Sequence, residues 1–243
     1  MFHKLEKLMR LFGRASLARG LLAFGIPGAV EHSSVIAFVR PRHLIDVGAN
    51  KGQFALATLA INPTIVIDCF EPVPASATKL EKWAKATSSQ IRVHRVALAK
   101  EKGTAQFHVT TREDSSSLFP PASPQLEIGV SVKETIVVET DRLDHKIEMH
   151  EVLRPSLLKI DVQGGELNVL RGIGDLCNVI DYIYLEVSFV ELYESQPLFS
   201  DIDAFLTSCG YKLLGMSNAY VDKKIGPTQA DALYGRVEPF MRD

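Results

Sequence analysis

From residue 43 onward, short apolar runs alternate with segments of helical periodicity. His43 to Val47 and Thr64 to Phe70 are compact runs, and each leads through a turn into a helical pattern, from about Gln53 to Ile61 and from about Ala75 to Thr87. Ile91 to Leu98 gives a third strand. Apolar strands that alternate with helices are typical of a parallel sheet covered on both faces. The pattern predicts an α/β fold with a mostly parallel central sheet and helices on both faces.

The middle of the chain departs from this alternation. Thr104 to Thr110 and Thr135 to Glu139 are expected to be added strands. The segment between them, Thr111 to Glu134, is rich in serine and proline and has the composition of a long loop. Such a loop inside a compact domain is usually functional or disordered. We expect a lid, with a variable surface loop as the alternative.

The strand–helix alternation resumes near residue 157 and continues to the end of the chain. The expected strands are Leu157 to Val162, Tyr182 to Val187, Tyr211 to Leu214 and Asp231 to Val237, and the expected helices are Glu166 to Arg171 and one that begins at a capping box of Ser200 and Asp203 and ends at Gly210. No domain boundary is visible after residue 40, so residues 41–243 are expected to form one domain.

Residues 1–40 are expected to form a helical extension. Phe2, Leu5, Leu8, Met9 and Phe12 recur at helical spacing, which predicts an amphipathic helix. Such a helix attaches to a membrane surface through residues 1–20, or packs on the domain or on a second subunit. We favour packing.

Composition narrows the possible partners and the location. The formal net charge is −2, which gives no general attraction to nucleic acid or anionic lipid. No run of about 20 apolar residues occurs, so no membrane span is expected. Cys69, Cys177 and Cys209 lack metal-ligand spacing and are expected to be free thiols in a reducing compartment. The charged N-terminal lead fits a signal peptide poorly, so we expect a cytoplasmic protein.

The first chemical motif runs from Leu44 to Phe54, where a strand passes through a tight turn into a helix. Gly48 is expected to let a ligand approach the backbone, and Gly52 to allow close packing of helix on strand. Asn50 can adopt a left-handed conformation. Asp46 ends the strand, and its carboxylate suits a cationic ligand group such as the α-amine of S-adenosylmethionine.

A second acid completes this cofactor pattern. Glu71 follows Asp46 by 25 residues, at the end of the next strand. An acid there can accept hydrogen bonds from both ribose hydroxyls of an adenosine ligand. Ligands bind such sheets at the carboxyl ends of the strands, so the two acids predict a nucleoside site. The alternative is that Asp46 caps a helix and Glu71 is a surface acid.

A nicotinamide dinucleotide is the competing cofactor. Its fingerprint needs glycine at three positions, which in this register are Gly48, Asn50 and Gln53. Only the first is glycine, so the dinucleotide hypothesis is weaker.

The second motif is Leu158 to Leu167, in which Asp161 ends a strand before a glycine turn. Asp161 should point into the same crevice as Asp46 and Glu71, as general base, substrate orienter or metal ligand, or it holds the turn amides. Glu166 opens a helix, where an acid is simply stabilising. Glu186 ends another strand and is the next catalytic candidate. No histidine has metal-ligand spacing, so no metal is expected.

These motifs resemble the FkbM family of methyltransferases. The resembling segments are Asp46 to Gly52, Phe70 to Pro72, Ser115 to Leu118, Leu158 to Leu167, Val169 to Gly172 and Leu185 to Val187. The resemblance implies a Rossmann-like class I methyltransferase fold, S-adenosylmethionine as methyl donor, and hydroxyl acceptors such as sugars and secondary metabolites. Many members have a glutamate where this chain has Gln163, so Gln163 cannot be a carboxylate base.

The sequence therefore predicts an S-adenosylmethionine-dependent O-methyltransferase acting on a hydroxyl of a sugar, glycoconjugate or secondary metabolite. Asp161 is the best candidate to remove the hydroxyl proton. Methyltransferases of planar amines carry an Asn/Asp-Pro-Pro-aromatic turn where this chain has Val162-Gln163-Gly164, which argues against nucleic-acid bases. An NAD-dependent oxidoreductase and a non-catalytic S-adenosylmethionine-binding module are the alternatives. The sequence leaves the oligomeric state open.

Overall fold

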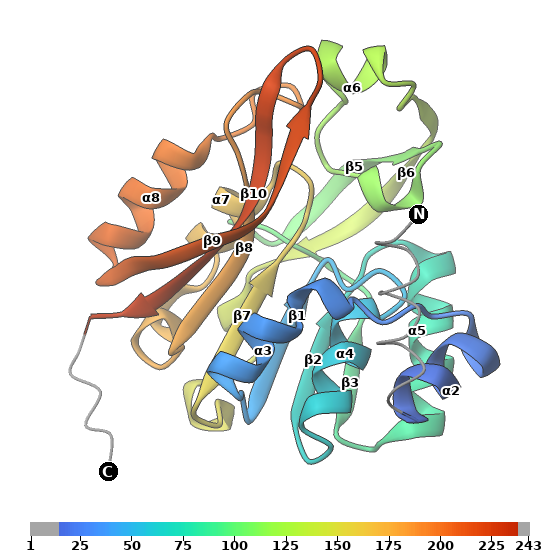
Figure 1. The fold of residues 1–243 in the computed structure, drawn as a ribbon, viewed down its shortest axis with the longest axis vertical. Coiled ribbons are helices and arrows are strands. Elements are labelled where there is room, and N and C mark those ends of the chain that lie inside the picture. The colour runs from blue at the N-terminus through green and yellow to red at the C-terminus, as the bar shows by residue number, and fades with distance from the viewer. Residues whose placement is uncertain (1–14, 238–243) are drawn as a thin grey trace.

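The computed structural model describes residues 15–237, which form a seven-stranded sheet and a smaller three-stranded sheet (Figure 1). The large sheet has the order β3-β2-β1-β7-β8-β10-β9. Its strands are β1 (His43–Val47), β2 (Val66–Phe70), β3 (Ile91–His94), β7 (Ser156–Ile160), β8 (Tyr182–Ser188), β9 (Tyr211–Asp222) and β10 (Gly226–Arg236). The first five strands of that order are parallel, and β10 pairs antiparallel with β8 and β9. The predicted mostly parallel sheet is confirmed.

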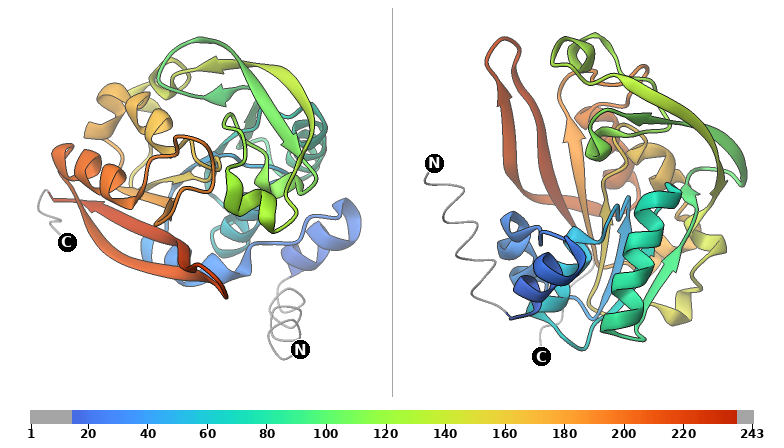
Figure 2. Two further views of the ribbon diagram at one scale, coloured as in Figure 1. Left: turned by 90° about the horizontal axis from the view of Figure 1, so that it is seen from above. Right: turned by 90° about the vertical axis from the view of Figure 1, so that its right-hand side faces the viewer.

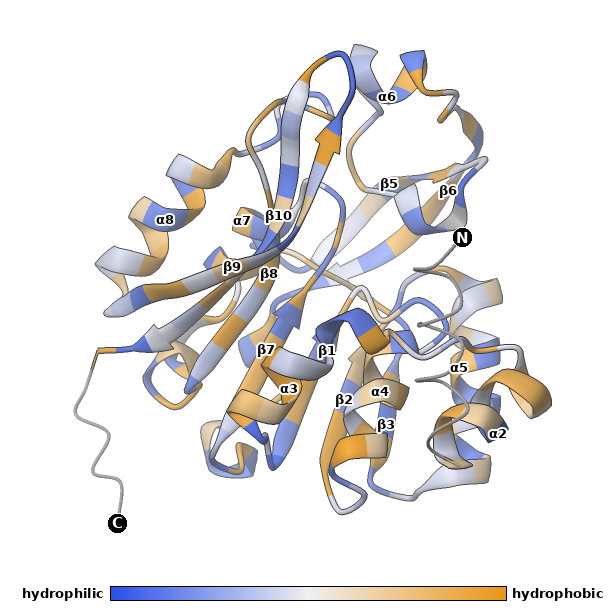
Figure 3. Cartoon of the chain, in the orientation of Figure 1, coloured by the Kyte–Doolittle hydropathy of each residue, from blue (hydrophilic) through white to orange (hydrophobic). Residues whose placement is uncertain are grey.

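Helices cover both faces of this sheet, as the sequence predicts (Figure 1). One face is covered by α2 (Ala15–Phe24), α3 (Ser33–Val39), α4 (Gln53–Ile61) and α5 (Pro74–Thr87), and the other by α7 (Glu166–Arg171) and α8 (Phe199–Ser208). Two separate apolar clusters fill the spaces between sheet and helices. Figure 3 shows that apolar residues are concentrated in the central strands, which helices shield from water on both sides.

The three-stranded sheet lies beyond the carboxyl ends of the central strands (Figure 2). It has the order β4-β6-β5, with β4 (Ala97–Leu98), β5 (Gly103–Thr110) and β6 (Val132–Asp141). The single strand expected at Ile91 to Leu98 was wrong, because the chain changes sheets after His94. β3 alternates apolar and polar residues and β4 is apolar, so both halves have a strand pattern and periodicity alone could not reveal the break.

The expected loop at 111–134 is more ordered than its composition indicates. It contains the 3-10 helix η2 (Glu113–Ser115) and α6 (Ser123–Glu127), and β6 begins before its end. Short 3-10 helices also occur at η1 (Val30–His32), η3 (Leu143–His145), η4 (Met149–Glu151) and η5 (Gly174–Asn178).

Two further expectations about element ends need correction. Helix α8 begins before Ser200, and Asp201 rather than Asp203 accepts the backbone N–H of Leu198 at its start. The strand expected at Tyr211 to Leu214 continues to Asp222, because β9 and β10 form a long hairpin that extends past the sheet (Figure 1). Most of β9 is exposed, so its residues need not alternate between apolar and polar and the sequence pattern does not mark its full length.

The described part of the N-terminal extension packs on the sheet domain. Leu17, Ile26, Val30, Ile36 and Val39 are buried in the same apolar cluster as α4. The amphipathic stripe from Phe2 to Phe12 lies outside the described residues, and its role stays a prediction. Within residues 15–237, no helix is long and apolar enough to cross a membrane.

Candidate active site

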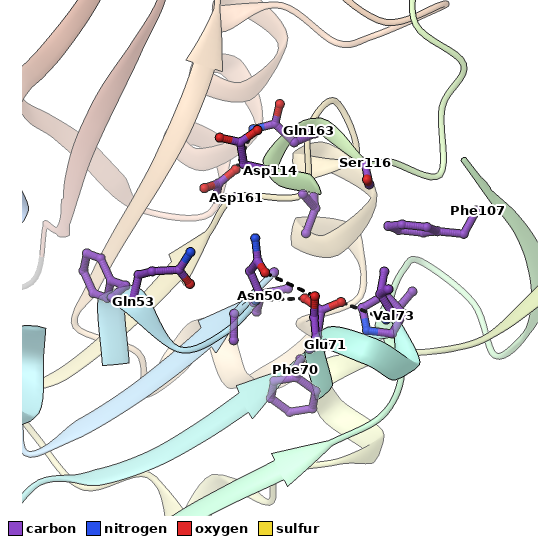
Figure 4. A pocket seen from close by; sticks show the side chains of 18 of the residues that line it. Asn50, Gln53, Phe70, Glu71, Val73, Phe107, Asp114, Ser116, Asp161 and Gln163 are labelled. Atoms are coloured by element: carbon purple, nitrogen blue, oxygen red, sulfur yellow. Dashed lines mark hydrogen bonds between the residues drawn. The ribbon is translucent and has the colours of Figure 1, made fainter. Parts of the chain in front are cut away.

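A cavity of about 580 Å³ opens at the carboxyl ends of β1, β2 and β7. This is the edge at which parallel α/β sheets bind ligands, and the volume is within the usual range for small-molecule sites. The N-terminal segment, the second sheet and the segment after β5 supply further walls. The lining includes Ala29, His32, Gly48, Asn50, Gln53, Phe54, Glu71, Val73, Val96, Leu98, Phe107, Asp114, Ser116, Lys159, Asp161 and Gln163 (Figure 4).

The turn after β1 has the left-handed backbone that its residues allow. Gly48, Asn50 and Gly52 have φ of +72°, +49° and +92°, so the conformation expected of Asn50 is confirmed. The reason for glycine at 48 differs from the expected one. A Cβ there would lie 1.8 Å from the carbonyl oxygen of Asp161, so Gly48 admits the chain's own backbone as well as lining the cavity.

Gly52 also serves packing, against a helix instead of a strand. A Cβ at Gly52 would lie 2.7 Å from Leu80 and 3.2 Å from Trp83, both on α5. This close approach lets α4 begin directly against α5 and fixes the direction in which the turn leaves β1.

Glu71 is buried at the end of β2 and faces the cavity. Its two carboxylate oxygens accept hydrogen bonds from the backbone N–H groups of Asn50 and Val73, each at 2.8 Å (Figure 4). Burial raises the pKa of Glu71 to about 7, against the lowering effect of these two bonds. A carboxylate has about four lone-pair sites, so Glu71 keeps capacity for further donors.

Asp46 occupies a different place from the one its position in the motif indicates. Its side chain is fully buried and does not line the cavity. The Nζ of Lys159 lies 3.1 Å from its carboxylate and donates to the carbonyl of Gly48, also at 3.1 Å. Burial alone would lower the pKa of Lys159, but the charges of Asp46 and Asp161 outweigh it and raise the pKa.

Sequence reasoning missed Lys159, although a lysine inside an apolar strand is a signal. Its side chain is 11% exposed and lines the cavity 3.8 Å from Asp161. A buried ammonium requires a charged partner, and Asp46 is that partner. The pair lies below the turn, with the ammonium as its cavity-facing end.

Asp161 and Glu186 are joined through Gln163, a residue that sequence reasoning had set aside. Asp161 lines the cavity as expected, but Glu186 does not. The Nε2 of Gln163 donates to Asp161 at 2.7 Å and to Glu186 at 2.9 Å. Tyr193 donates its hydroxyl to the Gln163 Oε1 at 2.8 Å, which fixes the direction of the amide. Gln163 has a left-handed backbone, with φ of +57°.

The two carboxylates differ in exposure. The Asp161 side chain is 43% exposed and lines the cavity, whereas Glu186 is set back and also accepts a hydrogen bond from Gln229 at 2.7 Å. Burial, with the charges of Asp161 and Glu166, raises the pKa of Glu186 well above its usual range. Asp161 is therefore the carboxylate that a ligand can reach.

Glu166 has the structural role that its place in the helix indicates. It is buried in the first turn of α7 and accepts hydrogen bonds from the backbone N–H groups of Val162 and Gly164. Burial raises the pKa of Glu166 to about 7. It holds the glycine turn that aims Asp161 and Gln163.

The segment from 111 to 134 covers part of the cavity and is tied to the site. Asp114, Ser116 and Leu118 are among its lining residues. Ser117 donates its hydroxyl to the Gln163 carbonyl at 2.6 Å, and the Ser115 carbonyl oxygen lies 3.0 Å from the Tyr193 hydroxyl oxygen. Arg112 and Phe119 of the same segment do not line the cavity.

The described residues contain neither a disulfide nor a cluster of side chains that could hold a metal ion. Cys69, Cys177 and Cys209 are free thiols. Within the described residues, no group of three or more His, Cys, Asp or Glu side chains has the arrangement of a metal site.

Comparison with known proteins places this geometry in a family. Residues 46–213 match the Methyltransferase FkbM domain. The chain is 30% identical to 2-O-methyltransferase NoeI of Sinorhizobium fredii over 66% of this chain and 69% of that protein. It is 25% identical to 31-O-demethyl-FK506 methyltransferase FkbM of Streptomyces tacrolimicus, over 72% and 75% of the two chains. It is also 25% identical to hexuronic acid methyltransferase AglP of Haloferax volcanii, over 59% and 55%.

The matched residues include Glu71 and Asp161, the two acids that face the cavity after β2 and β7. The expected resemblance to the FkbM family is confirmed. The nicotinamide alternative has no support in it. The chain belongs to the FkbM family of S-adenosylmethionine-dependent methyltransferases.

Proposed function

We propose that the protein transfers the methyl group of S-adenosylmethionine to a hydroxyl oxygen of a sugar, a glycoconjugate or another polyhydroxylated small molecule. The observation that carries the proposal is one continuous cavity with Glu71 at one part and the reachable Asp161 carboxylate at another (Figure 4). The first suits a nucleoside and the second suits a hydroxyl that must lose a proton.

The nucleoside part of the donor would lie against β2. Glu71 is held by two backbone N–H groups and retains acceptor capacity for the ribose hydroxyls. Val73, Val96, Leu98 and Phe107 offer apolar surface beside it, which suits the faces of an adenine ring.

Asp46 would act on the donor through Lys159. The buried carboxylate pairs with the ammonium, which also donates to the carbonyl of Gly48. These contacts fix the turn from Gly48 to Gly52, along which the amino-acid part of the donor would lie. Asp46, Gly48, Asn50, Gly52 and Glu71 are thus the proposed cofactor-binding set, with Asp46 as a positioning residue.

Bound S-adenosylmethionine supplies a methyl group on a positively charged sulfur, which is already activated for displacement. The protein has to position the acceptor in line with that bond and receive the hydroxyl proton. We assign proton removal to Asp161. The Gln163 amide binds one of its oxygens at 2.7 Å and leaves the other for the acceptor. Glu186 contributes by orienting the same amide.

The family relatives support the acceptor class. The names of two of them specify O-methylation or a demethylated oxygen, and the name of a third specifies a hexuronic acid. Asp114 and Ser116 place polar groups on the acceptor side of the cavity. The segment 111–134 would exclude water from that side as a lid.

The test is transfer of radioactive methyl from S-adenosylmethionine to panels of glycosides, nucleotide-sugars, glycolipids, nucleic acids and proteins. We expect incorporation into a hydroxylated carbohydrate or small molecule, and at least about a hundredfold less with Asp161→Asn at unchanged affinity for S-adenosylhomocysteine, because general bases contribute about a hundredfold or more. Labelling of nucleic acid alone refutes the acceptor class. Binding without transfer to any panel would support the non-catalytic alternative.

A further inference from the structure

The side chain of His32 lines the cavity and lies outside residues 46–213, the part of the chain that matches the family domain. His32, at the end of η1, lines the cavity, and its Nδ1 lies 2.9 Å from the Tyr184 hydroxyl and 3.3 Å from the Asp231 carboxylate. Tyr184 donates its own hydroxyl proton to Asp231 at 2.9 Å. The three side chains come from η1, β8 and β10 and form one connected relay.

The imidazole of His32 is held firmly. Its ring centroid lies 5.3 Å from that of Phe54 and 5.6 Å from that of Tyr184, the latter edge-on. Asp231 is 15% exposed and also accepts a hydrogen bond from Asn218 at 2.7 Å. Burial would raise the pKa of Asp231, yet His32, Asn218 and Tyr184 hold it below its usual value, so the relay contains a carboxylate anion.

These contacts favour one tautomer of His32. Because the Tyr184 proton points to Asp231, the lone pairs of the Tyr184 oxygen can accept from Nδ1 of His32, at 2.9 Å, and from the Ser217 hydroxyl, at 3.2 Å. A bare Nδ1 would instead turn its lone pair toward the carboxylate. The Asn218 amide nitrogen, at 3.3 Å from Nδ1, is the longer contact that would favour the opposite tautomer.

With the proton on Nδ1, the other ring nitrogen is a hydrogen-bond acceptor. Within residues 15–237, Nε2 of His32 has no hydrogen-bond partner, and the ring lies at the cavity wall beside Gln53 and Phe54. The side chain is 20% exposed. When the ring is neutral in this tautomer, Nε2 can accept a hydrogen bond from whatever occupies that part of the cavity.

His32 and Asp231 both lie outside residues 46–213, the part that matches the family domain. The rings of Phe54 and Tyr184, which pack against His32, both lie within the matched region. The relay thus joins His32 and Asp231, from the two flanking segments, to Tyr184 of the family domain.

We propose that His32, oriented by Tyr184 and Asp231, positions the methyl acceptor by accepting a hydrogen bond from a second hydroxyl group, distinct from the one that is methylated. This inference rests on the proposed function and deepens it. The acceptor must then be polyhydroxylated, with one hydroxyl at Asp161 and another at Nε2 of His32. A compound with a single hydroxyl would lack the second anchor.

The tautomer can be measured without knowing the acceptor. Nitrogen-15 NMR of histidine-labelled protein saturated with S-adenosylhomocysteine distinguishes protonated from bare ring nitrogens, and a spectrum of His32→Gln assigns the signal. We expect Nδ1 protonated and Nε2 bare at pH 8. We also expect the Nε2 signal to shift when methyl glycosides of hexoses, deoxyhexoses or N-acetylhexosamines are added. A bare Nδ1, or no shift with any glycoside, would overturn the proposal.

Two substitutions separate positioning of the acceptor from a structural role. The side-chain amide of glutamine can reach the place of Nε2, whereas that of asparagine reaches only the place of Nδ1. If Nε2 binds the acceptor, His32→Asn should raise the acceptor KM by about three- to tenfold at nearly unchanged kcat, as for one lost neutral hydrogen bond. His32→Gln should recover most of that loss. Recovery by asparagine and not by glutamine would make His32 structural.

The outcomes keep this inference apart from the proposed function. Methyl transfer to a glycoside with an unchanged KM in His32→Asn refutes the role of His32 and leaves the function standing. A glycoside-dependent shift of the His32 signal without methyl transfer refutes the function and leaves the hydroxyl site standing.

Discussion

The α-carbon of Gly48 faces the backbone of Asp161 so closely that a β-carbon at residue 48 would lie 1.8 Å from the Asp161 carbonyl oxygen. The two residues directly follow the neighbouring parallel strands β1 and β7. Gly48 therefore fixes the distance between the donor turn and the carboxylate proposed to receive the acceptor proton.

This contact predicts that Gly48→Ala destabilises the fold. The left-handed backbone costs about 1–2 kcal/mol for a residue with a side chain, and the forced shift of β7 about 1–3 kcal/mol more. Gly25→Ala is the matched control, because Gly25 has φ of +65° with nothing within 4 Å of its would-be Cβ. Urea unfolding should show the larger loss for Gly48→Ala. Equal losses of unfolding free energy in the two variants would mean that β7 moves away from a side chain at residue 48 at no measurable cost.

The pair of Lys159 and Asp46 predicts strong coupling in unfolding free energy. Lys159→Met leaves a fully buried carboxylate without its cation, which costs about 3–5 kcal/mol. Adding Asp46→Asn removes the uncompensated charge, so the double variant should be more stable than Lys159→Met alone. A double variant whose loss equals the sum of the single losses would show that the pair does not interact.

Glu71 predicts how donor affinity depends on pH. Its pKa in the folded protein is about 7, raised from 4.5, so the carboxyl becomes protonated as the pH falls through 7. Ribose hydroxyls donate to the charged form, so affinity for S-adenosylhomocysteine should be constant above pH 8 and weaken by up to about tenfold per unit below 7.

Calorimetric titration from pH 5.5 to 8.5 measures this dependence. Glu166 supplies the control, since its pKa is also about 7 but it lies beneath the second turn and does not line the cavity. Glu166→Gln should retain the pH dependence and Glu71→Gln should abolish it. Loss of the dependence in Glu166→Gln instead would assign the titration to the wrong acid.

Gln163 predicts a loss of turnover without a loss of donor binding. Its amide joins Asp161 and Glu186 and is itself fixed by Tyr193. Gln163→Leu should lower kcat by about tenfold, the effect of one charge-assisted hydrogen bond of roughly 1.5 kcal/mol, with affinity for S-adenosylhomocysteine unchanged. Tyr193→Phe should have a smaller effect in the same direction. If Gln163→Leu kept the wild-type kcat, Asp161 would not depend on the Gln163 amide for its orientation.

Local signals in the sequence were sufficient where one physical cause dominates. Helix α4 begins after Gly52 and ends before Pro63, and α7 ends at Gly172, so the bounds of both helices were predicted correctly. The break between β3 and β4 was missed because both segments have a strand pattern, and only pairing with different sheets separates them.

The site shows the same division. Glu71 and Asp161 end strands of a parallel sheet, and topology alone brings such residues to one edge. The burial of Asp46 beneath Lys159 depends on how the side chains of β1 and β7 face each other, which a motif does not reveal. His32 and Asp231 are nearly 200 residues apart, and only the complete fold makes them partners.

The most direct test of the proposed chemistry is the bond that carries the transferred methyl group. S-adenosylmethionine with a trideuterated methyl group is incubated with the protein and the acceptor found in the panel, and the product is examined by mass spectrometry before and after mild alkali. The account predicts one trideuteromethyl group on a hydroxyl oxygen, as an ether that survives alkali. Label released as methanol would show a carboxyl ester, and label on nitrogen or carbon would show a different reaction; either result would contradict methyl transfer to a hydroxyl.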